Sequence, residues 1–314
     1  MLAGAATAAA LLVHFAWAPL PALPVCVGLG VVLSNLGVVP IAFAPGLALA
    51  AARLLRLGVI LLGFDLVFPD VLNLGAKALA VVVAVVALTF FGTVWAGRRL
   101  GVSPTLALLV AVGFSICGVS AIAAANGVVD ADEDEVTFAV ALVTLCGTLA
   151  IVVLPTLRAP LGLTPEAYGA WVGAGVHDVA QVVATSSTAG GVALATAIVV
   201  KLTRVMLLAP LVALLAIRHA RADRRPRGRA LVPGFVVLFV AAIGLASTGA
   251  ISRELTHRLD DTRTVLLGMS LFALGTRVQI DRLLRIGVRP LVLGLSSWAL
   301  IAAAAYLGVR IAWA

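Results

Sequence analysis

Long stretches without a single charged residue limit the fold of this chain more than any other feature. Four of them run from Ala78 to Gly97, Val136 to Leu157, Leu231 to Ile251 and Pro290 to Val309. A helix of about 20 apolar residues crosses the ~30 Å hydrocarbon core of a bilayer. Lipid offers the backbone no hydrogen-bond partners, and the sequence lacks the polar–apolar alternation of a membrane barrel, so we expect these segments to be helices.

The composition extends this expectation to the whole chain. Hydrophobic residues make up 62% of the sequence and charged residues only 11%, far from the values of soluble domains. We predict an all-α polytopic membrane protein of about eleven spans. The first span has no basic segment before it and continues into apolar sequence, so we interpret it as a span and not as a cleaved signal peptide. The spans are expected near residues 2–18, 23–44, 50–68, 77–97, 104–126, 135–157, 165–187, 190–217, 231–250, 262–280 and 289–312.

The basic residues predict the orientation of these spans. The loop "RHARADRRPRGR" (residues 218–229) is rich in arginine, and short loops of this kind stay in the cytoplasm. The net charge of +8 therefore reflects membrane orientation and not nucleic-acid binding. We expect a cytoplasmic N-terminus, with the acidic turn "DADEDE" (residues 130–135) and the loop 253–263 outside. Four further basic positions are expected in the cytoplasm: Arg53 with Arg56, Arg98 with Arg99, Arg158, and the loop 281–289.

Leaving out the first span divides the remaining ten into five and five that enter the membrane from opposite sides. This is the arrangement of an inverted repeat, which is common in secondary transporters, and it predicts repeats at about 23–157 and 165–312. Two internal similarities support a repeat: "LGFDLVFPDVLNLG" with "LGTRVQIDRLLRIG", and "VGFSICGVSAIAAA" with "VGAGVHDVAQVVAT". The first pair does not occupy corresponding positions in the two repeats, so chance similarity is the alternative for both pairs.

Small residues in "GFSICGVSAIAAANG" (residues 113–127) predict a break in the helix within the membrane. A broken helix exposes backbone N–H groups at the start of its second half, and such ends bind anions. Close helix packing through small residues is the alternative. The candidate ligands at this break are Ser115, Cys117, Gly118 and Ser120. The glycines expected to break helices are Gly113 and Gly118 here, and Gly268 and Gly275 in the corresponding span of the second repeat.

Two further groups of polar residues lie deep within expected spans. His177 and Gln181 share one helix face with Asp178 beside them, at the middle of the span 165–187. A charge at that depth costs at least ~2.5–3.5 kcal/mol on insertion scales, so it should face a partner or a hydrated cavity. Lys201 and Arg204 should repel each other unless an anion or a carboxylate lies between them, and Asp178 can compensate only one of them. The alternatives are an ion pair that locks two helices together, and extension of the cationic side chains to the membrane surface.

These residues favour a secondary transporter of a small anion that works by alternating access. Lys201 and Arg204 would hold the anion with the half-helix ends around Ser115–Ser120, and His177 and Asp178 would exchange a coupled proton. Arg277 is as readily a cytoplasmic anchor as a ligand. The driving ion, H⁺ or Na⁺, stays open, as does a homodimer, and the expected partners are a small anion and the bilayer. A channel or membrane sensor is the alternative.

The sequence contains no sign of a cofactor, a metal site or an ATPase. Cys26, Cys117 and Cys146 lie in apolar segments without a CxxC pattern, and the chain has no GxxxxGK[ST] loop. An intramembrane hydrolase is less favoured than a transporter, because metal-dependent enzymes of that kind need several histidine and carboxylate ligands and His177 is the one deep histidine.

Three motifs in order, "GFSICGVSAIAA", "GAGVHDVAQVVA" and "ATAIVVKLTRVMLLAP", resemble the YeiH-type family, whose members are often labelled sulfate exporters. The resemblance covers nearly the whole chain. It implies an inner-membrane protein related to the sodium/bile-acid symporter and cation/proton antiporter fold, in which a panel domain supports a core domain with two crossing broken helices. Carried onto this chain, the crossing helices would be 104–126 and 262–280. The chain departs from the family pattern in having Asp178 where a glutamate often follows the histidine, and in its acidic turn at 130–135.

Overall fold

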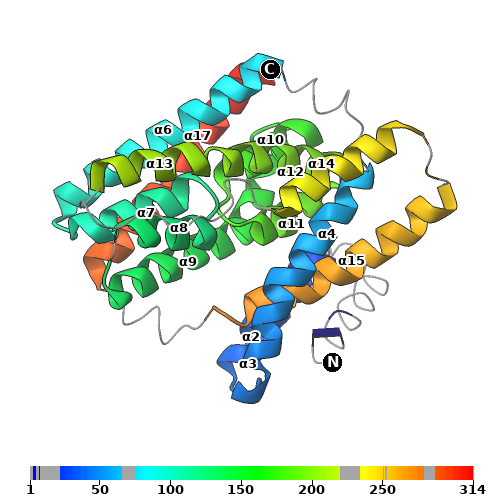
Figure 1. Cartoon of the computed structure of the whole chain (residues 1–314), viewed down its shortest axis with the longest axis horizontal. Helices are drawn as coiled ribbons and strands as arrows, with labels where there is room; N and C mark the ends of the chain where they lie inside the picture. Colours follow the sequence, from blue (N-terminus) through cyan, green and yellow to red (C-terminus); the bar gives the residue numbers. More distant parts are fainter. Residues whose placement is uncertain are drawn as a thin grey trace.

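The computed structural model describes residues 3–4, 7, 22–65, 75–129, 131–219, 234–249, 251, 253–278 and 287–313. The expected span 2–18 and most of the loops 218–229 and 281–289 lie outside these residues. The described part is helical and forms two bundles side by side, which we call the panel and the core (Figure 1). The panel contains α2 (Ala22–Asn35), α3 (Ala44–Leu49), α4 (Leu55–Leu62), α14 (Gly234–Ser247) and α15 (Arg253–Gly275), with the short helices η1 (Ile41–Phe43), η2 (Ala50–Leu54) and η3 (Gly63–Asp65). The core contains α6 (Gly75–Leu100), α7 (Pro104–Ser115), α8 (Val119–Val129), α9 (Glu133–Arg158), α10 (Pro165–Gly175), α11 (Val179–Ser186), η4 (Ser187–Ala189), α12 (Gly191–Met206), α13 (Leu208–His219) and α17 (Val288–Ala312).

The expected all-α polytopic class is confirmed. Four stretches of helix in the described part are long and apolar enough to cross a membrane: Gly75–Leu100, Asp134–Arg158, Gly191–Leu215 and Val288–Ala312. Large aliphatic and aromatic side chains are exposed on these helices, as expected for surfaces that face lipid. One boundary differs from the expectation: the turn between the second and third expected spans lies at residues 36–40, and helix resumes at Ile41 instead of near residue 50.

The segment 104–129 is a helical hairpin and not a helix that crosses the membrane. The chain reverses at Gly118, whose φ of 69° is in the left-handed region and whose N–H donates to the Gly113 carbonyl, so α7 ends with a glycine cap. A Cβ atom on Gly113 would lie 2.8 Å from the side chain of Ile122, so α8 folds back along α7. The Ser103 hydroxyl, just before α7, donates to Glu135 at the start of α9. Both ends of the hairpin therefore lie at the same end of the core.

The segment 165–189 is a second hairpin, which enters from the opposite end. Val176 and Asp178 have extended backbones and separate α10 from α11. The Tyr168 hydroxyl on α10 donates to the carbonyl oxygen of Thr185 on α11 at 3.2 Å. α8 packs on α13 whereas α11 packs on α12, so the two hairpins occupy opposite halves of the core (Figure 1).

The structure corrects three expectations about where helices break. The resemblance implied two crossing broken helices at 104–126 and 262–280, but the two interrupted segments are 104–129 and 165–189, and each returns to the end from which it entered. α15 is continuous from Arg253 to Gly275, so Gly268 does not break a helix, and Gly275 is the last residue of α15. Gly113 lies within α7, whereas Gly118 is at the break.

The hairpins also change which loops share a side. The acidic turn at 130–135 lies beside Ser103, at the end of the core that carries Arg98 and Arg99, and not on the side opposite to them as expected. Arg158 lies at the other end, because α9 runs the length of the core between them. We refer to these as the Arg98 end and the Arg158 end.

Several local features recur in pairs of helices. Gly63 at the end of α4 approaches the Phe239 carbonyl on α14 so closely that a Cβ atom would lie 2.7 Å from it, and Gly275 at the end of α15 approaches α2 in the same way. Ser103 and Thr164 each precede a proline and cap the first helix of a hairpin. We infer from these recurring features that α2, α4 and α6 pair with α14, α15 and α17, and that α7–α9 pair with α10–α13. In this pairing the units of the second repeat follow in the opposite order to those of the first.

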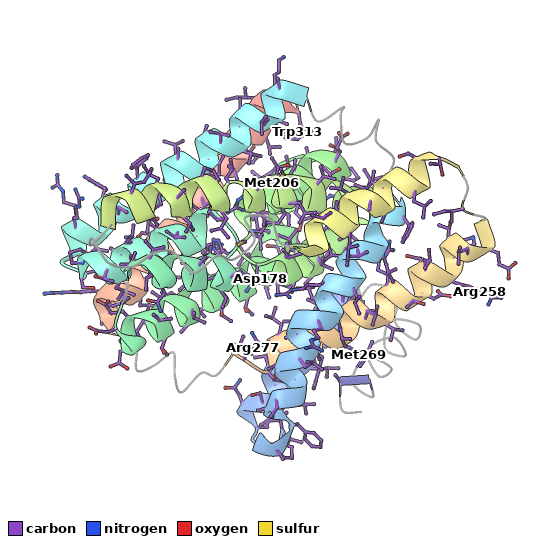
Figure 2. All side chains as sticks on the ribbon, viewed as in Figure 1. Asp178, Met206, Arg258, Met269, Arg277 and Trp313 are labelled. Carbon is purple, nitrogen blue, oxygen red and sulfur yellow. The ribbon has the colours of Figure 1, made fainter. Side chains whose placement is uncertain are left out.

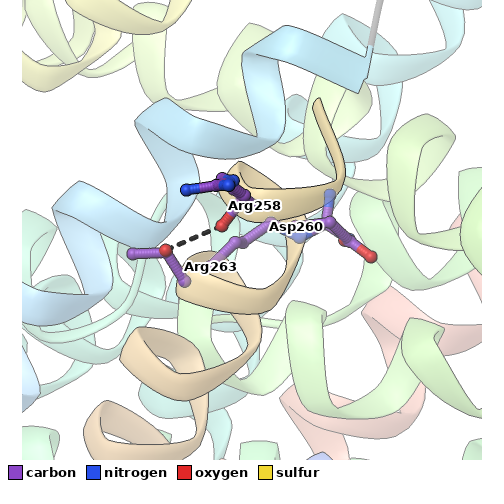
Figure 3. A network of polar contacts seen from close by, with 4 residues as sticks. Arg258, Asp260 and Arg263 are labelled. Carbon is purple, nitrogen blue, oxygen red and sulfur yellow. Dashed lines mark hydrogen bonds and ion pairs between the residues drawn. The ribbon is translucent and has the colours of Figure 1, made fainter. Parts of the chain in front are cut away.

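The charged segment 253–263, expected as a loop, forms the first turns of α15 (Figure 3). Ion pairs along the helix axis support it: Arg258 binds Glu254 at 2.8 Å, and Arg263 binds Asp260. An exposed i,i+4 pair such as Arg258–Glu254 contributes about 0.3–0.5 kcal/mol. The helix therefore extends beyond its apolar part.

Candidate functional site

The tips of the two hairpins meet in the middle of the core. The first tip is Ile116–Gly118, between α7 and α8, and the second is Val176–Asp178, between α10 and α11. The His177 ring on the second tip packs on the Phe114 ring at the first, with centroids 4.3 Å apart. α12 crosses both tips and directs Lys201 and Arg204, which are one helical turn apart, toward them.

Lys201 is fully buried and binds both tips. Its ammonium donates to the carbonyl oxygen of Ile116 at 2.6 Å on the first tip. On the second tip it donates to the carbonyl oxygens of Val176, at 3.0 Å, and His177. An ammonium group has three N–H donors, so all of them are used.

Arg204 is also fully buried and binds the same tips. Its Nε and Nη2 atoms donate to the Ser115 carbonyl at 3.2 and 2.9 Å, and Nη2 also donates to the Phe114 carbonyl at 3.0 Å. Its Nη1 atom donates to the carbonyls of Gly173 and Val176 at 3.1 and 2.9 Å. A guanidinium group has five N–H donors, and these five bonds use them all.

The partners of the two cations are thus backbone carbonyls, three from each hairpin. The last carbonyls of a helix lack partners within it and carry partial negative charge. α7 and α10 both end at this point, so their two negative ends converge where Lys201 and Arg204 lie. This arrangement removes the reason for placing an anion between the two cations, and it leaves neither side chain a donor for a ligand. Neither side chain extends to the membrane surface.

His177 is fully buried beside these cations. Its Nδ1 atom lies 3.3 Å from the Phe114 carbonyl, so this nitrogen carries the proton and donates. The Nε2 atom is buried with no hydrogen-bond partner among the described residues. A protonated ring would add a third positive charge next to Lys201 and Arg204, so the geometry favours neutral histidine.

Asp178 and Gln181 form the N-terminal cap of α11. The Asp178 carboxylate accepts from the Ala180 N–H at 2.9 Å, and Gln181 accepts from the Asp178 N–H at 3.1 Å, which is a capping box. The Gln181 amide also donates to the Thr144 carbonyl of α9 at 3.3 Å. Gly147 makes room for it, because a Cβ atom there would overlap the Gln181 amide. Thr144 and Gly147 were not predicted from the sequence.

A cavity of about 1460 Å³ separates the panel from the hairpin tips. Three of the predicted site residues line it: Cys117, Ser120 and Asp178. Val119 and Ser120 line it as the first two residues of α8, whose own first turn contains no acidic residue. Asp178 of the second tip lies close to Gly118, just before α8. The panel contributes Arg277, which lies at the end of α15, while Asp178 lies in the core (Figure 2).

The remaining predicted residues lie outside the cavity. Ser115 is buried and donates to the Ala111 carbonyl at 2.6 Å within α7. His177, Gln181, Lys201 and Arg204 are all buried behind the tips. The structure therefore brings the predicted residues together at one place but divides them into a buried layer and a layer that faces the cavity.

The sequence of this chain is similar to those of known membrane proteins. The family described as "Conserved hypothetical protein 698" matches residues 1–294. A UPF0324 membrane protein of Corynebacterium glutamicum is 42% identical over 98% of this chain and 90% of its own length. The UPF0324 inner membrane protein YeiH of Escherichia coli is 33% identical over 81% of this chain and 74% of its own length. No solved structure matches the chain.

Proposed function

Because the chain belongs to the YeiH-type UPF0324 family of membrane proteins, we propose that it is a secondary transporter of an anion in the inner membrane. The single observation that carries this proposal is the cavity between panel and core, which ends at the tips of two hairpins that enter from opposite ends. Hairpins of opposite direction, related by an inverted repeat, give a chain two similar ways to close such a cavity. Alternating access requires this property.

In this proposal the anion binds on the cavity side of the tips. The N-terminus of α8 attracts negative charge there, and the Ser120 hydroxyl offers a further donor. Lys201 and Arg204 hold the two tips together from behind. Asp178 is the carboxylate at the hairpin tips that lines the cavity, so we assign to it, and not to His177, the exchange of a coupling ion.

We further propose that the Arg98 end faces the cytoplasm. That end carries Arg98 and Arg99, and the basic loop 218–229 follows α13, whose neighbour α8 ends there. The cavity is lined by Asp134, near the same end, so it would open inward. The N-terminus would then be cytoplasmic if residues 2–18 cross the membrane.

Uptake into proteoliposomes tests the proposal. Purified protein is reconstituted and assayed with labelled sulfate and labelled butane-1-sulfonate, with pH and Na⁺ gradients imposed separately. We expect saturable uptake of at least one anion and counterflow when the unlabelled anion is inside. Uptake that does not saturate and shows no counterflow would indicate a channel, and the absence of any uptake would contradict the proposal.

A further inference from the structure

Two arginines line the cavity, whereas the two predicted cations lie outside it. Every donor of Lys201 and Arg204 is used by backbone carbonyls, so an anion in the cavity must be bound by something else. Arg56 and Arg277 line the cavity, together with the carboxylates of Asp134 and Asp178. Of the two arginines, Arg277 is the one that follows α15, a panel helix that packs against α11 of the second hairpin.

The backbone around Arg277 is fixed on both sides. The Ser34 hydroxyl of α2 donates to the Thr276 carbonyl at 2.8 Å, and the Asn35 amide donates to the Val278 carbonyl at 2.7 Å. The side chains of Thr276 and Val278 are buried, whereas Arg277 between them is exposed and lines the cavity. Its guanidinium makes no hydrogen bond or ion pair within the part of the chain that the structure describes. A fixed backbone with an unused guanidinium is suited to binding a ligand.

The walls of the cavity indicate what kind of anion fits. Most of the lining residues are aliphatic, including Leu47, Ala51 and Val59 from the panel and Val136, Val140 and Ala141 from the core. A bare inorganic oxyanion needs donors on all sides to replace its water, and these walls do not offer them. An organic anion needs donors only at its head group, and its apolar body gains free energy against aliphatic walls.

We propose that Arg277 binds the carboxylate or sulfonate head group of an organic anion whose apolar body lies along the aliphatic wall of the cavity. Ser34 and Asn35 act as positioning residues that hold Arg277 toward the hairpin tips. A guanidinium binds such a head group through two parallel hydrogen bonds. This inference rests on the proposed transport function and names the substrate class of the same site.

Inhibition by a series of alkanesulfonates tests the apolar wall in the wild-type protein. Methane-, propane- and pentane-1-sulfonate are tested as competitive inhibitors of the uptake of labelled butane-1-sulfonate and, separately, of labelled sulfate. We expect the inhibition constant to fall by up to about fourfold for each added methylene. Inhibition constants that do not change with chain length would contradict the claim that the aliphatic wall binds the apolar body of the anion. Sulfate uptake that no alkanesulfonate inhibits would overturn this inference and leave anion transport intact, whereas no anion uptake at all would also overturn the proposed function.

Variants of Arg277 test the head-group contact. We expect Arg277→Gln to raise the KM for butane-1-sulfonate about ten- to a hundredfold, Arg277→Lys to raise it less, and Ser34→Ala to raise it several-fold without changing kcat. Arg310→Gln, an exposed arginine on α17 that does not line the cavity, is the matched control. A KM for Arg277→Gln equal to that of the control would overturn the assignment. If Arg277→Gln does not fold, the conservative Arg277→Lys variant provides the same comparison.

Discussion

At the scale of single residues, the structure reverses the roles expected for the deepest charges. Lys201 and Arg204 were expected to bind an anion because two buried cations should repel each other. Their eight N–H donors instead bind carbonyls at the ends of two helices. The depth of these side chains could be predicted from the sequence. Their partners could not, because backbone carbonyls from residues 114–116 and 173–177 meet only in the folded chain.

Lys201→Met is expected to destabilise the fold as well as reduce transport. The substitution preserves the length of the side chain and leaves the carbonyls of Ile116 and His177 buried without the donor they now have. Each unsatisfied buried group costs about 1–3 kcal/mol. The thermal unfolding midpoint of the purified protein should therefore fall by several degrees, whereas Lys77→Met at an exposed site on α6 should leave it unchanged. A variant with the wild-type midpoint but no transport would indicate that Lys201 binds substrate directly.

Gly147→Ala tests the support of the second tip. The added Cβ atom overlaps the Gln181 amide, so Gln181 must leave the Thr144 carbonyl and the cap of α11. Overpacking of this kind costs about 1–3 kcal/mol. We expect a lower unfolding midpoint for Gly147→Ala and a smaller loss for the same change made together with Gln181→Ala.

The control for this pair is Gly46→Ala, since a Cβ atom on Gly46 meets nothing within 4 Å. Equal losses from Gly147→Ala with and without Gln181 would mean that the two residues do not interact.

At the scale of elements, the break at Gly118 was predictable and the break at residues 176–178 was missed. Glycine and small residues indicated the first. The second has no glycine among its three residues, but Asp178 followed by Gln181 at the third position is the pattern of a capping box, which indicates the start of a helix. The pattern lies within a continuous apolar run, and the length of that run favours one membrane span over a hairpin.

The inferred pairing of helices bears on the two internal similarities, of which the first pair did not match in the expected repeats. The first pair joins the end of α4 to the end of α15, and the second joins the two hairpin tips. Both become equivalent positions when the helices are paired in this way.

Paired glycines give a prediction at this scale. Gly63 and Gly275 occupy equivalent positions and each touches the backbone of a neighbouring helix. Gly63→Ala and Gly275→Ala should both lower the unfolding midpoint, by an amount that reflects about 1–3 kcal/mol of overpacking. Gly28→Ala on α2 should leave it unchanged, because a Cβ atom there has no neighbour within 4 Å. A loss at only one of the two positions would argue against the pairing.

At the scale of the whole molecule, the helical class and most helix positions followed from apolar length alone. The topology could not be predicted from apolar length, because a hairpin of two short helices has the same length and hydropathy as one crossing helix. Each hairpin changes the side on which all later loops lie. The prediction combined the positive-inside rule with eleven crossings, which counted both hairpins as crossing helices. For this reason the acidic turn and Arg158 were expected on the wrong sides relative to Arg98.

The most direct test of the account is the side on which three loops lie. Asp132→Cys, Ala159→Cys and Ala222→Cys are made one at a time in a chain without its native cysteines, and intact cells are treated with a membrane-impermeant maleimide. If 104–129 and 165–189 are hairpins, positions 132 and 222 lie on one side of the membrane and position 159 lies on the other. With the Arg98 end in the cytoplasm, only the thiol at position 159 then reacts with the maleimide. Labelling that places positions 159 and 222 together, opposite to 132, would show that both segments cross the membrane and would contradict the account.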